Sequence, residues 1–76
     1  MRKTQHTREY RRLIEALRKA RESVGFTQDE VAEELGTYAS FISKCESGER
    51  AIDIAELWAI SNIYGKPLSH FAPDKG

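Results

Sequence analysis

Few side chains in this sequence could carry out covalent chemistry or hold a metal ion. Cys45 is the single cysteine of the 76-residue chain, so it cannot form an internal disulfide, and a lone cysteine usually packs as a small hydrophobic side chain. His6 and His70 lie near opposite ends, with no third ligand at a spacing that suits zinc. No Ser/His/Asp set or carboxylate pair stands out. We therefore expect no catalytic residue, no metal and no cofactor, and a protein that is not an enzyme.

The apolar residues that would have to position any site recur at helical spacing. From about Thr7 they are separated by three and four residues, which is typical of an amphipathic helix, and Gly25 is placed as its C-terminal cap. The sequence therefore predicts one long first helix. The apolar residues that show this spacing are Leu13, Ile14, Leu17, Ala20 and Val24.

A capping box marks the start of the next helix. Thr27 and Glu30 can each bond to the other's backbone amide, which predicts a second helix that ends at Gly36. After a very short turn, a third helix is predicted over about 39–47, ended by Gly48. The two helices are therefore short and closely joined.

A second capping box precedes the last third of the chain. Asp53 and Glu56 form this box, and the helix that follows is predicted to run to about Tyr64. A short last helix, opened by a proline, is expected to contain Leu68 and Phe71. Because no segment reads as a strand, the predicted fold class is all-α, with five helices.

Two short helices joined by a glycine-containing turn can place the second helix in the major groove of DNA, although helical hairpins that bind no DNA share this spacing. The residue identities are more specific. They read Gly25-Phe26-Thr27-Gln28-Asp29-Glu30-Val31-Ala32-Glu33-Glu34-Leu35-Gly36, then Ser40-Phe41-Ile42-Ser43-Lys44-Cys45-Glu46-Ser47-Gly48-Glu49-Arg50. This pattern resembles the phage-repressor and Cro-like (XRE-type) helix-turn-helix family over about Leu13 to Phe71. The resemblance implies a repressor-like five-helix DNA-binding domain, as used by phage repressors, restriction-modification controller proteins and antitoxins.

The resemblance also assigns roles to individual residues. It implies that Gln28, at the start of the second helix, contacts a DNA phosphate, and that Ser43 and Arg50 do so as well. The positions that read bases are Tyr38, Ala39, Ser40 and Lys44. Lys44 can donate to guanine O6 and N7, Ser40 can pair with several bases, and the Ala39 methyl can pack on a thymine methyl.

Two of these positions depart from the family pattern. The family commonly has Ser or Thr where Tyr38 stands, and a tyrosine cannot cap a helix in that way, so the start of the third helix is open to a shift. Ala39 stands where a glutamine is common, so a bidentate contact with adenine is lost. The resemblance therefore does not predict the operator sequence.

One ion pair is implied by the resemblance. Arg21 in the first helix and Glu46 at the end of the third match positions that pair in the phage-repressor group. A buried, bidentate pair would lock the reading helix onto the scaffold, whereas an exposed pair would be worth only about 0–1 kcal/mol. We therefore expect a contact between Arg21 and Glu46.

Large apolar residues crowd the C-terminal third, and some of them are expected to form an interface. This region matches the part through which controller-type relatives dimerise, which implies a symmetric homodimer whose copies reach half-sites ~34 Å apart. The residues expected at the interface are Tyr64, Leu68 and Phe71. Those expected in the core are Leu57, Trp58 and Ile60.

The charge distribution leaves two functions open. Net charge is zero, but residues 1–25 hold eight Lys/Arg against three Glu, whereas residues 26–76 hold four against nine Asp/Glu. A basic half can face phosphates or can be a solvated helix face. The alternative to a DNA-binding regulator is a protein-binding module, such as an antitoxin or an assembly subunit. A net acidic surface around Gln28, Lys44 and Arg50 would favour the alternative.

The length predicts a single domain over 1–76, with a core of about 9–72 and loose ends at 1–6 and 73–76. The loose N-terminal end begins a basic extension made of Arg2, Lys3, Arg8, Arg11 and Arg12, for which the sequence leaves two interpretations open, a segment that follows a DNA groove and a frayed end. The chain has no apolar run of membrane-spanning length and no internal disulfide, so we expect a soluble cytoplasmic protein.

Overall fold

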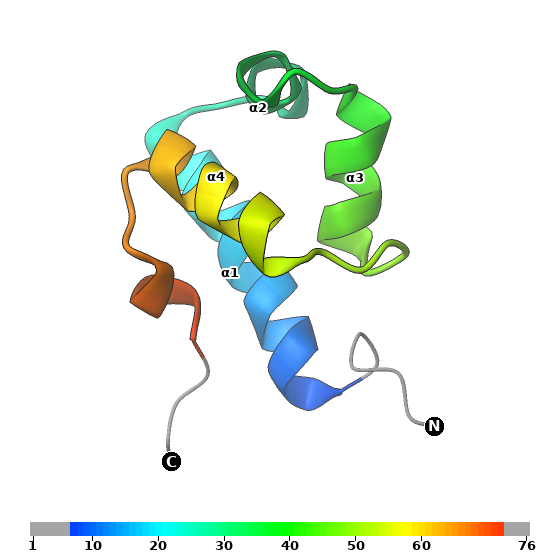
Figure 1. Ribbon diagram of the computed structural model, residues 1–76, viewed down its shortest axis with the longest axis vertical. Helices are drawn as coiled ribbons and strands as arrows, with labels where there is room; N and C mark the ends of the chain where they lie inside the picture. Colours follow the sequence, from blue (N-terminus) through cyan, green and yellow to red (C-terminus); the bar gives the residue numbers. More distant parts are fainter. Residues whose placement is uncertain (1–6, 73–76) are drawn as a thin grey trace.

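The computed structural model describes residues 7–72, and these residues form an all-helical fold (Figure 1). Its elements are α1 (Arg8–Val24), α2 (Gln28–Leu35), α3 (Ala39–Ser47), α4 (Ile54–Tyr64) and the 3-10 helix η2 (Leu68–Phe71). The all-α class is confirmed for the described residues. The predicted count of five helices is not, because the last element is a single 3-10 turn of four residues, held by the bond from the His70 amide to the Pro67 carbonyl at 2.9 Å.

The ends of the helices are fixed by local hydrogen bonds. In the α2 box, the Thr27 amide donates to Glu30 Oε1 at 2.8 Å and the Glu30 amide donates to Thr27 Oγ1 at 3.1 Å. In the α4 box, the Asp53 amide donates to Glu56 Oε1 at 3.1 Å and the Glu56 amide donates to Asp53 Oδ1 at 2.7 Å. Both predicted capping boxes are therefore present, and each satisfies two amides that a helix start leaves unpaired.

Gly48 ends α3 in a conformation and a place that suit glycine. Its φ is +82°, in the left-handed region, and a Cβ at this position would lie 3.1 Å from Ile14 Cδ1 of α1. A side chain here would add backbone strain and crowd the helix beneath it. The glycine therefore lets the end of α3 approach α1 closely.

The core lies where α1 and α4 pass between the α2–α3 pair on one side and η2 on the other (Figure 1). It is a continuous cluster of buried residues, namely Leu17, Ala20, Val31, Ala32, Ile42, Ile60, Tyr64 and Phe71. Ile14 and Cys45 are also buried. The cluster joins every element, so α2 and α3 pack together against α1 and α4.

Some sequence predictions fall outside the described residues. These are the loose ends at 1–6 and 73–76, the zinc-site question at His6, and the first part of the basic extension, Arg2 and Lys3. The rest of that extension, including Arg8, lies in the first turns of α1 and is exposed to solvent.

Candidate nucleic-acid interface

The turn between α2 and α3 brings the two helices together as the sequence predicts. Gly36 ends α2 with a φ of +77°, and the Thr37 amide returns to the Ala32 carbonyl at 2.8 Å. Tyr38 precedes α3 without any side-chain capping bond, yet α3 still begins at Ala39. The Tyr38 carbonyl accepts from the amides of residues 41 and 42 at 2.9 and 3.4 Å, so the backbone alone starts the helix and no shift occurs.

The outer face of α3 is polar and open to solvent. The residues it exposes are Ser40, Ser43, Lys44 and Ser47, and they recur at spacings of three and four. Tyr38 is 78% exposed beside this face, whereas Ala39 is half-buried. The structure therefore brings the predicted α3 residues to one surface. Lys44, on this surface, makes no ion pair with any residue in 7–72.

Ser47 belongs to this face and was missed by the sequence analysis. Its spacing from Ser40 and Ser43 is the signal that could have found it. Its hydroxyl is already engaged, because it donates to the Lys44 carbonyl at 3.1 Å and accepts from the Glu49 amide at 3.3 Å. Ser47 therefore closes the last turn of α3. Its hydroxyl has little hydrogen-bonding capacity left for a ligand.

A buried ion pair holds α3 against α1. Arg21 Nε donates to Glu46 Oε2 at 2.7 Å and Arg21 Nη2 donates to Glu46 Oε1 at 3.0 Å, with only 11% and 7% of the two side chains exposed. The third nitrogen, Nη1, donates to the Phe26 carbonyl at 3.0 Å. The hydrogen bonds to Glu46 raise the pKa of Arg21. The pair expected from the resemblance is therefore present in its buried, bidentate form.

Gln28 lies at the first position of α2, beside this ion pair. Its Nε2 donates to Glu46 Oε1 at 3.1 Å, so the half-buried amide is held by the carboxylate of α3. The start of α2, the end of α1 and the last turn of α3 thus meet at Glu46. Neither the spacing of the residues nor the family resemblance predicts this link between Gln28 and Glu46.

Arg50 occupies the loop between α3 and α4 and is oriented by three groups. Its Nη1 donates to Glu56 Oε1 at 3.1 Å and to the Ala51 carbonyl at 3.0 Å, and its guanidinium lies 4.5 Å from the centre of the Phe41 ring. The hydrogen bond that Arg50 donates to Glu56 raises the pKa of Arg50. Glu56 compensates part of the charge of Arg50.

The charges around the interface are modest. Two cations of this interface, Arg21 and Arg50, are paired with carboxylates, whereas its third cation, Lys44, makes no ion pair with residues 7–72. The acidic residues of α2 are all exposed, namely Asp29, Glu30, Glu33 and Glu34. Basic residues are exposed along α1, namely Arg8, Arg11, Arg12, Arg18 and Lys19. Around α3 and the loop after it, three cations (Arg21, Lys44 and Arg50) stand against three carboxylates (Glu46, Glu49 and Glu56), so this surface is not strongly basic.

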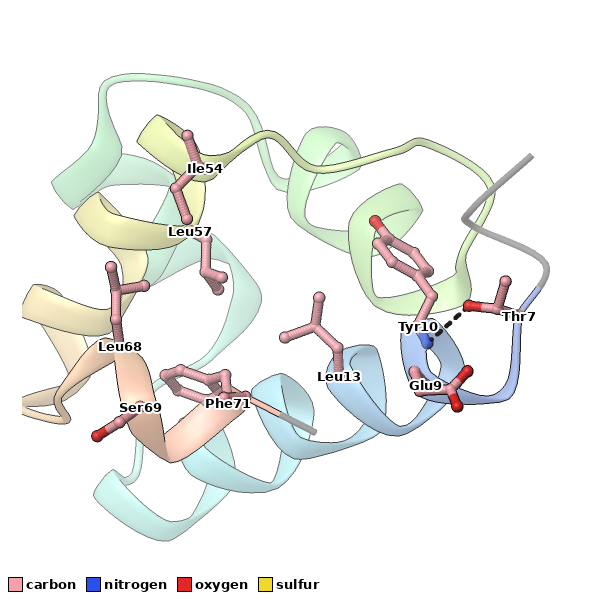
Figure 2. A pocket seen from close by; sticks show the side chains of 10 residues that line it. Thr7, Glu9, Tyr10, Leu13, Ile54, Leu57, Leu68, Ser69 and Phe71 are labelled. Carbon is pink, nitrogen blue, oxygen red and sulfur yellow. Dashed lines mark hydrogen bonds between the residues drawn. The ribbon is translucent and has the colours of Figure 1, made fainter. Parts of the chain in front are cut away.

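An apolar groove lies between α1, α4 and η2, away from the polar face of α3. Figure 2 shows Leu13, Leu57, Leu68 and Phe71 pointing toward one another around it, with Tyr10 and Ile54 at its edges. Its volume is about 460 Å³. This lies within the range of binding cavities in proteins, roughly 300–1,000 Å³.

The predicted interface residues need a correction. Tyr64 and Phe71 are each only 4% exposed and belong to the core, because η2 folds back onto α1 and α4, and of the two only Phe71 lines the groove. Leu68 is half-buried and lines the groove. The large exposed residues of α4 are instead Ile54, at 69%, and Trp58, at 58%, so the core position expected for Trp58 is wrong.

Several other kinds of site are absent from the part of the chain that the structure describes. Residues 7–72 hold no group of three or more His, Cys, Asp or Glu side chains that could bind a metal ion. No helix in this range is long and apolar enough to span a bilayer. Cys45 is buried, and burial raises the pKa of its thiol.

Comparison with known proteins agrees with this geometry. A family profile described as helix-turn-helix matches residues 17–71. Similar solved structures include apo-HppE, with a TM-score of 0.77 and 24% identity over 86% of this chain and 36% of that chain. Hydroxypropylphosphonic acid epoxidase from S. wedmorenis gives a TM-score of 0.76 and 24% identity over 86% of this chain and 35% of that chain. No curated protein matches.

The likeness to these structures concerns the fold alone. The identity is 24%, and the chain spans only about a third of the length of the chains it matches. The resemblance therefore extends to one part of those proteins.

Proposed function

Because this chain belongs to the phage-repressor and Cro-like helix-turn-helix family, we propose that it binds double-stranded DNA sequence-specifically as a transcriptional regulator, with α3 in the major groove. The observation that carries this proposal is the polar face of α3, which exposes Ser40, Ser43 and Lys44 together beside the start of α2. The proposed mechanism is occupancy of an operator, without catalysis.

The base-reading residues of the proposal are those that α3 exposes near its start. Lys44 donates to guanine O6 and N7, Ser40 pairs with a base edge, and the half-buried Ala39 offers its methyl to a thymine. Tyr38, which is exposed just before the helix, adds an aromatic ring with a hydroxyl. Sequence preference therefore depends most on Lys44, which has the strongest donor.

Phosphate contacts would fix the position of α3 in the groove. Gln28 and the amides at the start of α2 supply one contact, and Ser43 and Arg50 supply others. Arg50 is held in place by Glu56 and Phe41, so it reaches a phosphate with little further ordering. These contacts orient the protein on the duplex and carry no base preference.

A symmetric homodimer is part of the proposal, through a surface that differs from the one expected from the sequence. Ile54 and Trp58 are exposed one turn apart on α4, and Ile54 also lines the apolar groove with Leu68. A second copy placed by a two-fold axis would bring the same side chains and the same groove to the contact. Two α3 helices would then read a palindromic operator.

A protein-binding module is the second candidate, and one observation favours it. Pairing of Arg21 with Glu46 and of Arg50 with Glu56 leaves little free positive charge on the α3 side of residues 7–72. DNA affinity depends strongly on such charge. A weakly basic face would serve a protein partner as well as DNA.

Selection from random duplexes at several salt concentrations tests the proposal. A regulator enriches a palindromic motif, and its affinity falls linearly with the logarithm of salt concentration. Lys44→Ala should lose the preference at one position of the motif, whereas Gln28→Ala should weaken binding to all sequences. Lys19→Ala, which removes the same charge from the outer face of α1, is the matched control. Absence of any motif and negligible binding at physiological salt would support the protein-binding candidate instead.

A further inference from the structure

The carboxylate of Glu46, on α3, accepts hydrogen bonds from side chains of two other helices. Oε2 accepts from Arg21 Nε of α1 at 2.7 Å, and Oε1 accepts both from Arg21 Nη2 at 3.0 Å and from Gln28 Nε2 of α2 at 3.1 Å. Glu46 itself is only 7% exposed in its side chain. The buried carboxylate of Glu46, on α3, therefore holds the side chain of Gln28, on α2.

From this geometry we propose that Glu46 is a positioning residue for DNA binding, which aims the amide of Gln28 at a phosphate. The inference rests on the proposed function. One N–H of the Gln28 amide is used by Glu46. A side-chain amide carries two such donors, so the second remains for a phosphate oxygen. Since the bond to Glu46 fixes the amide plane, it also fixes the direction of the second donor.

Ordering Gln28 before DNA arrives would raise affinity. Glutamine is among the side chains that lose the most rotamer freedom when they are fixed, and that loss normally counts against binding. In this chain Glu46 has already fixed the side chain in the free protein. DNA binding then needs little further ordering of Gln28.

Arg21 allows a carboxylate to lie this close to a phosphate contact. An unpaired glutamate beside the DNA backbone would repel it. The Arg21 guanidinium engages both oxygens of Glu46, so the pair is neutral as a unit. Glu46 thus acts as an acceptor for Gln28 without adding net negative charge to the surface.

A mutant cycle separates this role from a merely structural one. The four proteins are the wild type, Gln28→Ala, Arg21→Met with Glu46→Met, and the triple variant. Replacing both members of a buried ion pair with apolar residues of similar size often leaves stability unchanged and leaves no unpaired charge. The Arg21→Met/Glu46→Met protein also keeps the net charge of the wild type. Affinity for the selected duplex is measured for each protein, with its melting temperature as a check of folding.

The positioning role predicts effects that do not add. Loss of a hydrogen bond to a charged phosphate should lower affinity by about tenfold in Gln28→Ala. Arg21→Met/Glu46→Met should lower it by a similar factor, and the triple variant should bind as Gln28→Ala does. A structural effect on α3 would instead persist when Gln28 is absent. Additive losses, or an Arg21→Met/Glu46→Met protein that binds as the wild type does, would overturn the role.

Nuclear magnetic resonance tests the contact without any variant or DNA. In the free wild-type protein, the side-chain amide protons of Gln28 should show NOEs to the γ-methylene protons of Glu46. Absence of these NOEs would overturn the proposal even if a variant failed to fold. If the NOEs are present and the wild type binds no duplex, the proposed function fails and the positioning role fails with it. If the wild type binds and the cycle is additive, only the positioning role fails.

Discussion

The hydroxyl of Tyr10, in the first turns of α1, accepts a hydrogen bond from the backbone amide of Ile52 at 2.8 Å. This bond ties α1 to the loop that carries Arg50. Tyr10→Phe keeps the ring and removes the acceptor, so we expect it to lower the free energy of unfolding by about 1 kcal/mol. For a domain of this size, that change corresponds to a melting temperature lower by roughly 4–8 °C.

Tyr38→Phe is the control for this prediction. Tyr38 is 78% exposed and its hydroxyl makes no bond to residues 7–72. Its removal should leave the melting temperature unchanged within error. Equal shifts in the two variants would contradict the importance of the Tyr10–Ile52 bond.

Glu46→Ala should be strongly destabilising, because it leaves the Arg21 guanidinium, which is 11% exposed, without its partner. Removing one member of a buried pair typically costs about 3–5 kcal/mol of unfolding free energy. Glu15→Ala breaks the exposed pair with Lys19, whose atoms are 3.8 Å apart, and should cost less than about 0.5 kcal/mol. Denaturant unfolding of both proteins makes the comparison. A small effect of Glu46→Ala would mean that the pair contributes little to stability.

The sequence predicts the helices well because their ends are set locally. The capping boxes at Thr27 and Asp53 and the glycine at position 48 lie at the helix ends, and the third helix runs over Ala39–Ser47 as predicted. The last element differs from the prediction because only four residues follow Pro67 in it. So short a segment forms a 3-10 turn and not an α-helix.

The positions that the sequence mispredicts lie in α4 and its surroundings. This helix is apolar on nearly all sides, so periodicity cannot tell that Tyr64 faces the core and Trp58 faces solvent. Contacts such as Gln28–Glu46 and Arg50–Glu56 depend on how loops turn and how helices pack. The spacing of residues along one helix carries no such information. The Arg21–Glu46 pair was foreseen only because the family resemblance supplied it.

Neutralising Glu56 should change the salt dependence of DNA binding. In Glu56→Gln, Oε1 can still accept from the Asp53 amide, but the charge that pairs with Arg50 is lost. Because Glu56 no longer compensates the charge that Arg50 brings to its proposed phosphate contact, the slope of log affinity against log salt should steepen by up to about 0.9. Affinity at low salt should rise. Filter binding over a range of salt concentrations measures both quantities.

Glu9→Gln is the control for the salt experiment. It removes the same negative charge from the first turn of α1, beside the apolar groove. The slope for Glu9→Gln should match that of the wild type, because a charge changes the slope only where it affects a contact with a phosphate. A slope for Glu56→Gln that equals both would argue against a phosphate contact by Arg50.

Stability should fall in alkaline solution because three acids, the buried Cys45 and Tyr64 and the half-buried Tyr10, resist ionisation in the folded chain. Burial raises the pKa of the Cys45 thiol above its ordinary 9.0, and burial likewise raises the pKa of Tyr10 and Tyr64 above 10.0. Above these ordinary values the unfolded chain releases protons that the folded chain retains. The stability that these groups contribute is therefore fully present below about pH 9. As the pH rises further, the free energy of unfolding falls by up to about 1.4 kcal/mol per pH unit for each group.

Cys45→Ala isolates the first part of this alkaline loss. The variant should be less stable at neutral pH, because it leaves a small cavity in the core, but its stability should stay flat between about pH 9 and pH 10. Tyr64→Phe should keep the loss that begins near pH 9 and reduce the one above pH 10. Urea unfolding at a series of pH values gives both profiles. A Cys45→Ala profile parallel to the wild type would show that the thiol ionises alike in both states.

Ile54→Lys should convert the proposed dimer to a monomer. Ile54 is 69% exposed on α4, and a lysine there would place two like charges across the two-fold axis. Trp58, the single tryptophan of the chain, lies one turn away and remains as a probe. In the wild type, its fluorescence should shift to shorter wavelength as concentration rises, because dimerisation removes the ring from water, while sedimentation reports the doubled mass. Tyr38→Lys, on the α3 side, should leave both readouts unchanged. A wild type with constant emission and the mass of one chain would instead mean that the α4 face is not a self-association surface, and that each copy reaches DNA alone.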